Sequence, residues 1–396
     1  MSGQYGNGNL PPRPSLITIL SEWGRIGCLG FGGPPTHIRM LRDLCVERRK
    51  WMSPAEFEDA VVACNLLPGP ASTQLSLLCA WRVRGRTGAV VGGAAFIGPG
   101  LILILVLAAL FLQSSPPRAV LAAAAGAGAA VAAVAVHAAA GLLPTSWARA
   151  RERGPAYRFR WAGYALAGVA AAATIGPWLV VVLLACGAIE VATRPWRSGA
   201  APLSIAPIPL LALGSLGLGT LSSLVWMAIK VGALSYGGGF VIVPLMQNDA
   251  VNAHGWMTGG QFLNAVALGQ ITPGPVVHTV AVIGYAAAGL FGGVLAAAVA
   301  FTPSFAFVLI GAPHFDRLRA SPGVRRFLDG AGPTAIGAIG GSAFALARTL
   351  TQPWQYVVLA LASVLLLLAR RSVVFTLLAA GLAGIIAVGA GLPLPH

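Results

Sequence analysis

Long uncharged stretches alternate with short polar and basic segments along this chain. The stretches "TGAVVGGAAFIGPGLILILVLAALFLQ" (87–113), "VVLALASVLLLLA" (357–369) and "VVFTLLAAGLAGIIAVG" (373–389) reach or approach the roughly 20 residues that a helix needs to cross a bilayer. A transmembrane barrel would instead show segments of about 10 residues that alternate in polarity, and this pattern is absent from the sequence. The pattern therefore predicts an all-α polytopic membrane protein.

Composition agrees with this prediction and narrows the class of partner. The 396 residues are 57% hydrophobic and 9% charged, whereas soluble domains carry about a quarter charged residues. The net charge is +15, but the Arg residues cluster in short loops between apolar segments, which is typical of the positive-inside rule. We therefore expect a lipid bilayer around the chain and no nucleic acid. The five cysteines show no metal-ligand spacing, so neither a metal nor a cofactor is predicted.

An internal repeat divides the chain. Shifting the sequence by 205 positions aligns residues 27–96 with residues 232–301 without a gap, and 16 of these 70 positions are identical. The matches include Trp51 with Trp256 and a whole Pro-Gly-Pro, which a Gly- and Ala-rich composition does not produce by chance. Two homologous halves are therefore predicted. The expected domains are residues 1–200 and 201–396.

Equivalent loops of the two halves differ in charge. Residues 82–86 read "RVRGR", whereas the equivalent residues 287–291 read "AAGLF". Residues 34–54 carry five Lys and Arg residues, whereas residues 239–259 carry none. Because loops rich in Lys and Arg stay in the cytoplasm, these loops are predicted inside in the first half and outside in the second. The halves should therefore be inverted repeats, as is common in secondary transporters.

The basic flanks also predict a re-entrant hairpin at about residues 55–81. Because both flanks are basic, this segment should enter and leave the membrane on the same side. A helix over residues 55–67 rises about 20 Å, which reaches the middle of a hydrocarbon core of about 30 Å without crossing it. The equivalent hairpin covers about residues 260–286. The alternative is a Pro-Gly-Pro that merely joins two full spans.

The Pro-Gly-Pro residues suit the tip of such a hairpin. Pro68 is predicted to end the incoming helix, Gly69 to permit the reversal, and Pro70 to begin the outgoing helix. The free N–H groups near Ser72 and Thr73 would then form the positive end of a helix dipole, which suits an anion. The equivalent tip consists of Pro273, Gly274, Pro275, Val276, Val277 and His278.

Two cations occupy equivalent positions, each two residues before a matched Gly and seven before a matched Gly-Gly. They are Arg25 and Lys230, and Lys230 is the only Lys or Arg between Arg197 and Arg317. Because an uncompensated charge is costly in such a setting, both are predicted to bind substrate. The alternative for Arg25 is a structural ion pair with Glu22, one turn earlier; Lys230 has no such local partner.

The glycines after each cation are predicted to break the helix and to free backbone donors, with close helix packing as the alternative role. They are Gly32, Gly33, Gly237 and Gly238. At the second tip, His278 stands where Thr73 stands in the first. Its predicted roles are anion binding or proton relay, and a packing histidine is the alternative.

The repeated motifs resemble the chromate transporter family in its long, two-domain form. The resemblance rests on "GFGGPPTHIRMLRDLCVERRKWMS" and "NLLPGPASTQ" in the first half, and on "SYGGGFVIVPLM", "GWMTGGQFLNAVALGQITPGPVVHT" and "IGYAAAGLFGG" in the second. It also includes "FLDGAGPTAIGAI", so it spans most of the chain. The resemblance implies an inner-membrane protein that exports chromate and protects the cell, with the proton motive force as the usual energy source.

The chain departs from the family pattern at two positions. Gln74 and Asn264 stand where the family commonly has an acidic residue, which puts proton coupling at these positions in doubt. Among the remaining carboxylates, Asp59 on the incoming half-helix is the best coupling candidate, and Glu22 is another.

The sequence leaves three alternatives to chromate transport. Sulfate is a similar tetrahedral dianion, so transport of sulfate or another oxyanion is the first alternative. An anion channel is a second. A third is an intramembrane enzyme that uses Ser72 as nucleophile and His278 as base, which no G-x-S-x-G or H-E-x-x-H context supports, so no catalytic residue is predicted. The sequence does not determine the oligomeric state, and a homo-oligomer is one alternative.

Overall fold

A computed structural model describes residues 14–66, 69–113, 115–174, 179–193, 219–235, 240–312 and 321–395. Within these ranges the secondary structure is helical, and no strand occurs. This result confirms the all-α prediction. Three helices, α4, α5 and the segment that ends with α11, are long and apolar enough to cross a membrane.

The described helices follow the repeat in their order. The first half contains α1 (Leu16–Leu29), α2 (Pro34–Arg42), α3 (Pro54–Leu66), α4 (Ala71–Phe111), α5 (Arg118–Glu152), α6 (Pro155–Thr174) and α7 (Leu179–Ala192). The second contains α8 (Thr220–Leu234), α9 (Val243–Gln247), α10 (Gly259–Ile271), α11 (Thr279–Gly311), α13 (Pro322–Ala347), α14 (Pro353–Ser363) and α15 (Val373–Gly389). Short π-helical turns η1 (Asp43–Arg48) and η5 (Asn248–Ala253) occupy equivalent positions after α2 and α9.

The long helix α4 is a hairpin of two helical arms. Gly85 has φ +69° and ψ −157°, which is not helical, and it separates residues 71–84 from residues 86–111. A Cβ built on Gly93 would overlap the side chain of Leu77. In a straight helix these two residues would lie about 24 Å apart, so the chain must reverse at Gly85.

The equivalent helix α11 folds in the same way. Gly289 has φ +62° and ψ −156°, nearly the same values as Gly85 in α4. A Cβ on Gly284 would overlap the carbonyl oxygen of Gly292, which places the two arms of α11 in contact. Because a positive φ strains residues that carry a Cβ, glycine suits each fold point.

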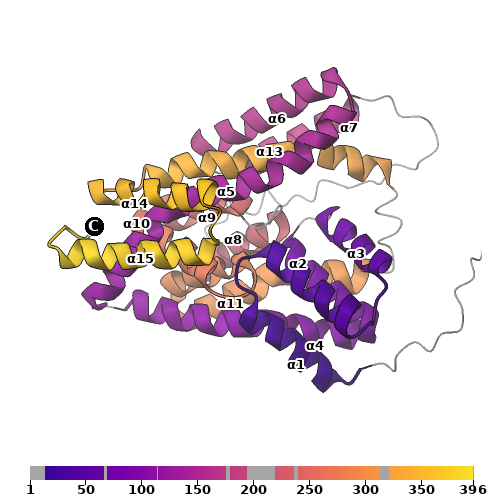
Figure 1. Cartoon of the computed structure of the whole chain (residues 1–396), viewed down its shortest axis with the longest axis horizontal. Helices are drawn as coiled ribbons and strands as arrows, with labels where there is room; N and C mark the ends of the chain where they lie inside the picture. The colour runs from indigo at the N-terminus through magenta and orange to yellow at the C-terminus, as the bar shows by residue number, and fades with distance from the viewer. Residues whose placement is uncertain are drawn as a thin grey trace, which may run out of the picture.

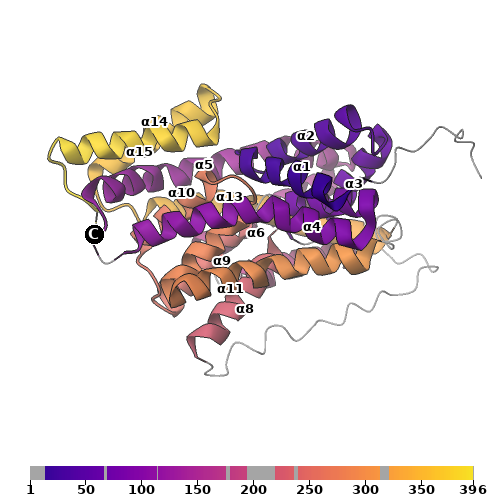
Figure 2. The same ribbon diagram turned by 90° about the horizontal axis from the view of Figure 1, so that it is seen from below.

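The second arms of α4 and α11 pack against each other in opposite directions (Figure 2). Gly93 near the start of one arm meets Phe305 near the end of the other. Conversely, Gly293 meets Leu105. Contacts that run in reverse order along two helices mean that the helices are antiparallel.

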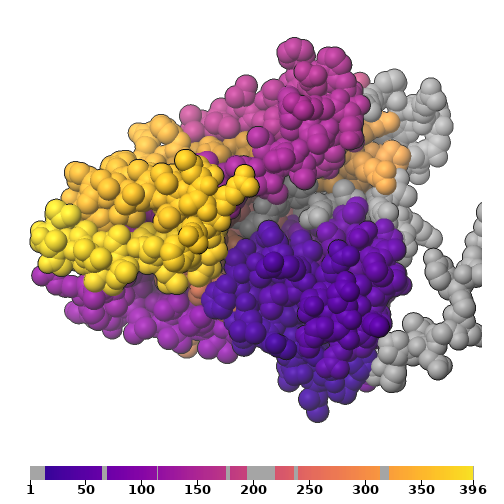
Figure 3. All heavy atoms as spheres, in the orientation of Figure 1, coloured from indigo at the N-terminus to yellow at the C-terminus, as the bar shows by residue number. Residues whose placement is uncertain are grey.

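The remaining helices pack mainly across the two halves. The helix α5 of the first half packs against α10, α14 and α15 of the second, and α13 of the second half packs against α6 and α7 of the first (Figure 1). Small residues make this close packing possible: Gly126 lies against Ala380, and Gly168 lies against Thr334. On the face seen in Figure 3, the N-terminal elements and the C-terminal pair α14 and α15 lie beside each other.

Candidate functional site at the interrupted helices

The first Pro-Gly-Pro lies between α3 and α4, where the chain reverses. Gly69 has φ +119°, which favours glycine, and Pro70 caps α4. The N–H of Thr73 donates to the Pro70 carbonyl at 3.0 Å. Ala71 and Ser72 therefore occupy the first turn of α4, at the positive end of its dipole. The side chains of Ser72 and Thr73 are buried.

The second tip repeats this geometry. Gly274 has φ +95°, and Pro275 caps the short turn η6 (Val276–His278), which leads directly into α11. The N–H of His278 donates to the Pro275 carbonyl at 3.0 Å. The His278 ring is fully buried and meets the Phe301 ring edge to face, with centroids 5.4 Å apart. A glycine with positive φ is thus present at both tips.

Each tip lies against the first helix of the other half. The Gly274 N–H donates to the carbonyl of Gly30, at the end of α1, at 3.0 Å. A Cβ on Gly100 in α4 would overlap the Pro273 carbonyl oxygen, so this second tip also packs on α4. Reciprocally, a Cβ on Gly69 would lie 3.5 Å from the carbonyl oxygen of Gly232 in α8.

The two tips lie at the same level of the crossing between α4 and α11. The middle of this crossing, between the contacts described above, falls near Pro99 of α4 and Val299 of α11. The second tip touches Gly100, next to the first of these residues. The first tip borders Gly232, which in turn packs against the carbonyl of Ala300, next to the second.

The helix break after α1 has the predicted form. The helix ends at Leu29, Gly32 and Gly33 have φ +99° and +75°, and α2 begins at Pro34. In the second half, α8 ends at Leu234. Three predicted site residues lie outside the described residues: Pro68, Gly237 and Gly238.

The sequence interpretation missed His37. This side chain is fully buried, and its Nε2 lies 2.7 Å from the Gly30 carbonyl oxygen, the same atom that accepts the Gly274 N–H. Its ring meets Phe96 edge to face, with centroids 5.0 Å apart. A signal was present in the sequence, because His37 follows the Gly-Gly-Pro-Pro segment of a motif that was already singled out.

Buried polar atoms without a hydrogen-bond partner concentrate at these interruptions. Such atoms cost about 1–3 kcal/mol each, so native proteins keep few of them without a functional reason. The tips, the ends of α8 and α10 and the second arm of α11 all contribute some. Among the described residues they include His37 Nδ1, Thr73 Oγ1, Ser76 Oγ, Ser235 Oγ, Gln270 Nε2, both ring nitrogens of His278, and Ser304 Oγ.

Arg25 lies away from this buried centre. It is exposed on α1 and lines a cavity of about 330 Å³, whose other charged residues are Arg39, Arg48, Glu22 and Asp43. The alternative partner Glu22 pairs instead with Arg49 at 2.5 Å and with Arg48 at 3.6 Å. Within the described ranges, Arg25 forms no ion pair. Glu22 is thereby placed in a structural contact between α1 and the residues after α2.

Lys230 has a partner, so the prediction of an uncompensated cation is wrong for this residue. Its Nζ lies 2.5 Å from Oδ2 of Asp249 in η5, and it also lies over the ring of Trp226. Asp249 is 19 residues away along the chain and meets Lys230 only through packing. An inspection of nearby sequence positions therefore could not reveal the pair.

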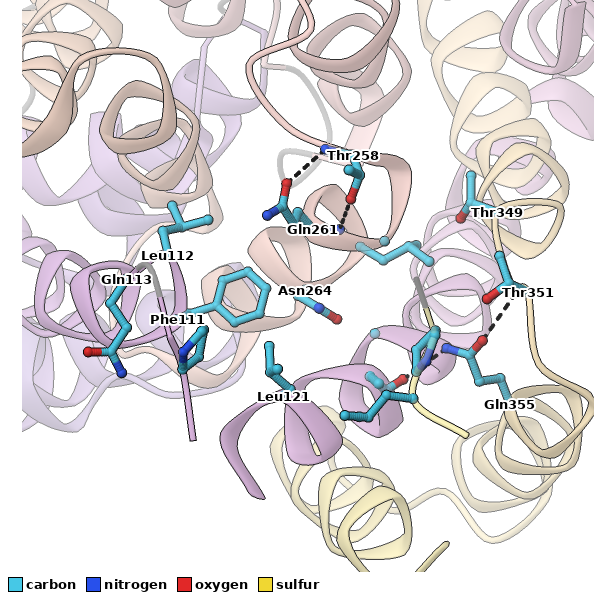
Figure 4. Close-up of a pocket in the computed structure, with 17 residues that line it drawn as sticks. Phe111, Leu112, Gln113, Leu121, Thr258, Gln261, Asn264, Thr349, Thr351 and Gln355 are labelled. Atoms are coloured by element: carbon cyan, nitrogen blue, oxygen red, sulfur yellow. Dashed lines mark hydrogen bonds between the residues drawn. The ribbon is translucent and has the colours of Figure 1, made fainter. Parts of the chain in front are cut away.

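The coupling candidate Asp59 lies exposed on α3, and its repeat equivalent is Asn264 on α10. Asn264 points into a second cavity of about 360 Å³ between α5, α10 and the segment before α14 (Figure 4). The other polar side chains of this cavity are uncharged amides and hydroxyls, among them Gln261, Thr351 and Gln355. The cavities beside Arg25 and Asn264 thus differ sharply in charge.

Comparisons with known proteins place the chain in a family. The family model described as chromate transporter matches residues 17–191 and 222–385. The chain belongs to the chromate transporter family. Two relatives are similar to the chain over nearly their whole length. The chromate transport protein of Pseudomonas aeruginosa is 30% identical over 95% of this chain and 93% of its own. The chromate transport protein of Cupriavidus metallidurans is 30% identical over 96% of this chain and 94% of its own.

A third relative extends the family beyond these two organisms. The probable chromate transport protein of Synechococcus elongatus is 29% identical over 85% of this chain and 86% of its own. No solved structure matches the chain. Family membership and the apolar helices together indicate a multi-pass membrane transporter.

Proposed function

We propose that this protein is a secondary active transporter that exports chromate across the inner membrane and so confers chromate resistance. The observation that carries the proposal is the placement of the two Pro-Gly-Pro tips. Both lie at the level of one helix crossing, each against the other half, among buried polar atoms that lack partners. An oxyanion between the tips would receive hydrogen bonds from these groups and from the first amides of α4 and η6.

The antiparallel packing of α4 and α11 supports inverted repeats. If the halves were parallel repeats, equivalent helices would cross the membrane in the same direction. The second arms of α4 and α11 instead run in opposite directions, in agreement with the opposite charges of their loops. The short helices α3 and α10, with 13 residues each, rise about 20 Å and so suit re-entrant hairpins.

The two cavities suit the two sides of the membrane. The cavity that contains Arg25 has a small net positive charge, from three arginines against two carboxylates. This basic cavity lies beside loops predicted to be cytoplasmic, where it would attract an anion before transport. The uncharged cavity beside Asn264 lies next to loops predicted to be external and would release the anion. A membrane potential contributes about 2.3 kcal/mol per charge per 100 mV, so a dianion gains about 4.6 kcal/mol by leaving a negative interior.

Sulfate is the second candidate substrate, since it shares the charge and tetrahedral shape of chromate. The hydrogen-bond donors at the tips do not distinguish between the two anions. The enzyme alternative has less support, because Ser72 and His278 form no hydrogen bond with each other within the described residues.

Flux measurements test the proposal. Purified protein in lipid vesicles should move chromate when a potential is imposed with a potassium gradient and an ionophore, and the flux should saturate with chromate. Unlabelled sulfate, added in excess, would separate the two substrates by competition. The matched control is the Gly274→Leu protein, in which a bulky side chain obstructs one tip.

The possible results lead to different conclusions. Saturable chromate flux that sulfate hardly inhibits supports a chromate transporter. A flux that sulfate carries better would assign sulfate as substrate. Current that does not saturate would indicate a channel, and the absence of flux for both anions would overturn the proposed function.

A further inference from the structure

A pair of buried histidines joins the two halves at the second tip. His37 belongs to the first half and His278 to the second, and both are fully buried. The Gly30 carbonyl oxygen connects the two histidines. It accepts a hydrogen bond from His37 Nε2 and another from the N–H of Gly274, near His278. Gly274 lies in contact with the His278 ring, since a Cβ there would lie 3.0 Å from its Cε1.

The hydrogen bond of His37 determines which ring nitrogen carries its proton. A carbonyl oxygen only accepts, so Nε2 must donate to Gly30 and must carry the hydrogen. The other nitrogen, Nδ1, then has a free lone pair, and it is buried without a partner. A neutral His37 therefore presents a proton acceptor, not a donor, to the interior. An oxyanion nearby would be repelled by this lone pair unless the ring gained a proton.

The rings of the pair lie against aromatic side chains: Phe96 meets His37 edge to face, and Phe301 meets His278 edge to face. Within the described residues no charged side chain forms a hydrogen bond or an ion pair with either ring. The titratable side chains on the packed elements are Glu22, Arg25 and Cys28 of α1, Arg39 and Arg42 of α2, Asp43, Cys45, Glu47 and Arg48 of η1, Cys79, Arg82, Arg84 and Arg86 of α4, Lys230 of α8, and Tyr285 of α11, while α10 has none.

We propose that His37 and His278 form a proton-binding site that is coupled to the oxyanion, in which His37 takes up one proton on Nδ1 when the anion binds. The inference rests on the proposed function and deepens it. Protonation converts Nδ1 from an acceptor into a donor, so that the ring can hydrogen-bond the anion while Nε2 keeps its bond to Gly30. The proton comes from water, and no bond of the substrate changes.

Electrostatics makes the two binding events interdependent. A buried imidazolium without a counterion is costly, so the empty site keeps His37 neutral. A buried dianion is costlier still, and a neighbouring positive charge offsets part of that cost. Each ligand therefore favours the other, and this coupling is reciprocal by thermodynamic necessity. The ring of His278 brings a polar group from the other half of the molecule to the same place, in contact with Gly274.

Calorimetry tests this coupling. Chromate is titrated into purified full-length protein in several buffers that differ in ionisation enthalpy, which yields the number of protons taken up on binding. His37→Gln is the decisive variant, because its amide can still donate to Gly30 but has no group that titrates. The difference in proton uptake between parent and variant cancels the protonation of chromate itself.

The parent should take up about one proton more than His37→Gln near neutral pH. Its affinity should fall up to about tenfold per pH unit as pH rises, since one linked proton is worth about 1.4 kcal/mol per unit, whereas the affinity of the variant should change much less. The control is His254→Gln, which replaces an exposed histidine stacked on Trp256 and should behave like the parent.

Each result decides a separate point. Equal proton uptake by the parent and His37→Gln, with chromate bound by both, would overturn the histidine proposal and leave the transporter proposal intact. If His37→Gln does not fold, His278→Gln and the parent still decide: no proton uptake by the parent beyond that of chromate itself overturns the proposal. A parent that binds no chromate would overturn the proposed function, and this inference with it.

Discussion

The two halves tie their first helix to the following π-helical turn with an ion pair, but the pairs have opposite polarity. In the first half, Glu22 of α1 binds Arg49 directly after η1. In the second, Lys230 of α8 binds Asp249 within η5. The same two elements are thus held together by charges of reversed sign. The contact between these elements is common to both halves, whereas the residues that make it differ.

Backbone geometry, in contrast, is repeated closely. Both tips place a glycine at positive φ, and both long helices fold back at a glycine with nearly the same dihedral angles. These positions depend on close backbone approach, which few residue types permit. Surface charge instead depends on the side of the membrane that each loop faces. Glycine geometry at the tips and fold points is therefore shared by the two halves, whereas loop charge differs between them.

The largest expected effect concerns the side of the membrane on which equivalent loops lie. In a background without cysteines, Arg86→Cys and Phe291→Cys place one reporter on each of the two equivalent loops. An impermeant thiol reagent should label the first only from the cytoplasm and the second only from outside, because the loops differ in charge. Both residues are exposed, and Phe291 is 65% exposed. Labelling of both from one side would contradict inverted repeats.

A single added methyl group should have a large effect on flux where α4 contacts the second tip and little effect where α4 has open space. In Gly100→Ala the new Cβ meets the carbonyl oxygen of Pro273, whereas in Gly98→Ala it meets open space. Overpacking costs about 1–3 kcal/mol, so chromate flux through Gly100→Ala should fall about tenfold or more. Flux through Gly98→Ala should match that of the parent at equal membrane levels.

The second half offers the same test at the other tip. In Gly232→Ala the new Cβ would overlap the Ala300 carbonyl beside the first tip and force α8 away from it, so this change should reduce flux as strongly. Normal flux in both Gly100→Ala and Gly232→Ala would show that the tips tolerate displacement and do not form the site.

The ion pairs should differ in their contribution to stability. Asp249→Asn leaves Lys230 without its partner, and these side chains are only 12% and 20% exposed. We expect a loss of about 2 kcal/mol in unfolding free energy, between the values for surface and buried pairs. Glu22→Gln frees arginines that are 42% and 45% exposed and can turn to water, so the loss should be about 1 kcal/mol or less.

Thermal unfolding in detergent measures both changes. A charge-reversed pair, Lys230→Asp with Asp249→Lys, should recover part of the lost stability because the polarity differs between the halves already. If the double variant loses as much unfolding free energy as its two single variants together, the two residues do not interact directly.

The smallest expected effect is at the basic cavity. Arg25→Gln removes an exposed cation, so the KM for chromate should rise about threefold at low salt and much less at high salt, where surface charges are screened. Arg42→Gln, which removes an exposed charge outside the cavity, is the control and should leave KM nearly unchanged. A rise in KM that does not depend on salt would indicate a role other than attraction of the anion.

The sequence was informative where local rules apply. The apolar stretches predicted helices, and the glycine between two prolines predicted a turn. Gly69 and Gly274 both have a positive φ, which few other residues adopt. The Gly-Gly after α1 was expected to break that helix, and it does so at Gly32 and Gly33. Each of these features is decided by residues that are neighbours along the chain.

The sequence by itself determined an all-α membrane protein of this family, because hydropathy and glycine motifs are local properties of the chain. Only the tertiary structure decided that Asp249 neutralises Lys230, that Glu22 binds Arg49 rather than Arg25, and that His37 meets the tip of the other half. These partners are far apart in sequence. They come together through the exchange of helices between the halves, with α5 packed on α15 and α13 on α6, and helix packing brings together residues that no local pattern links.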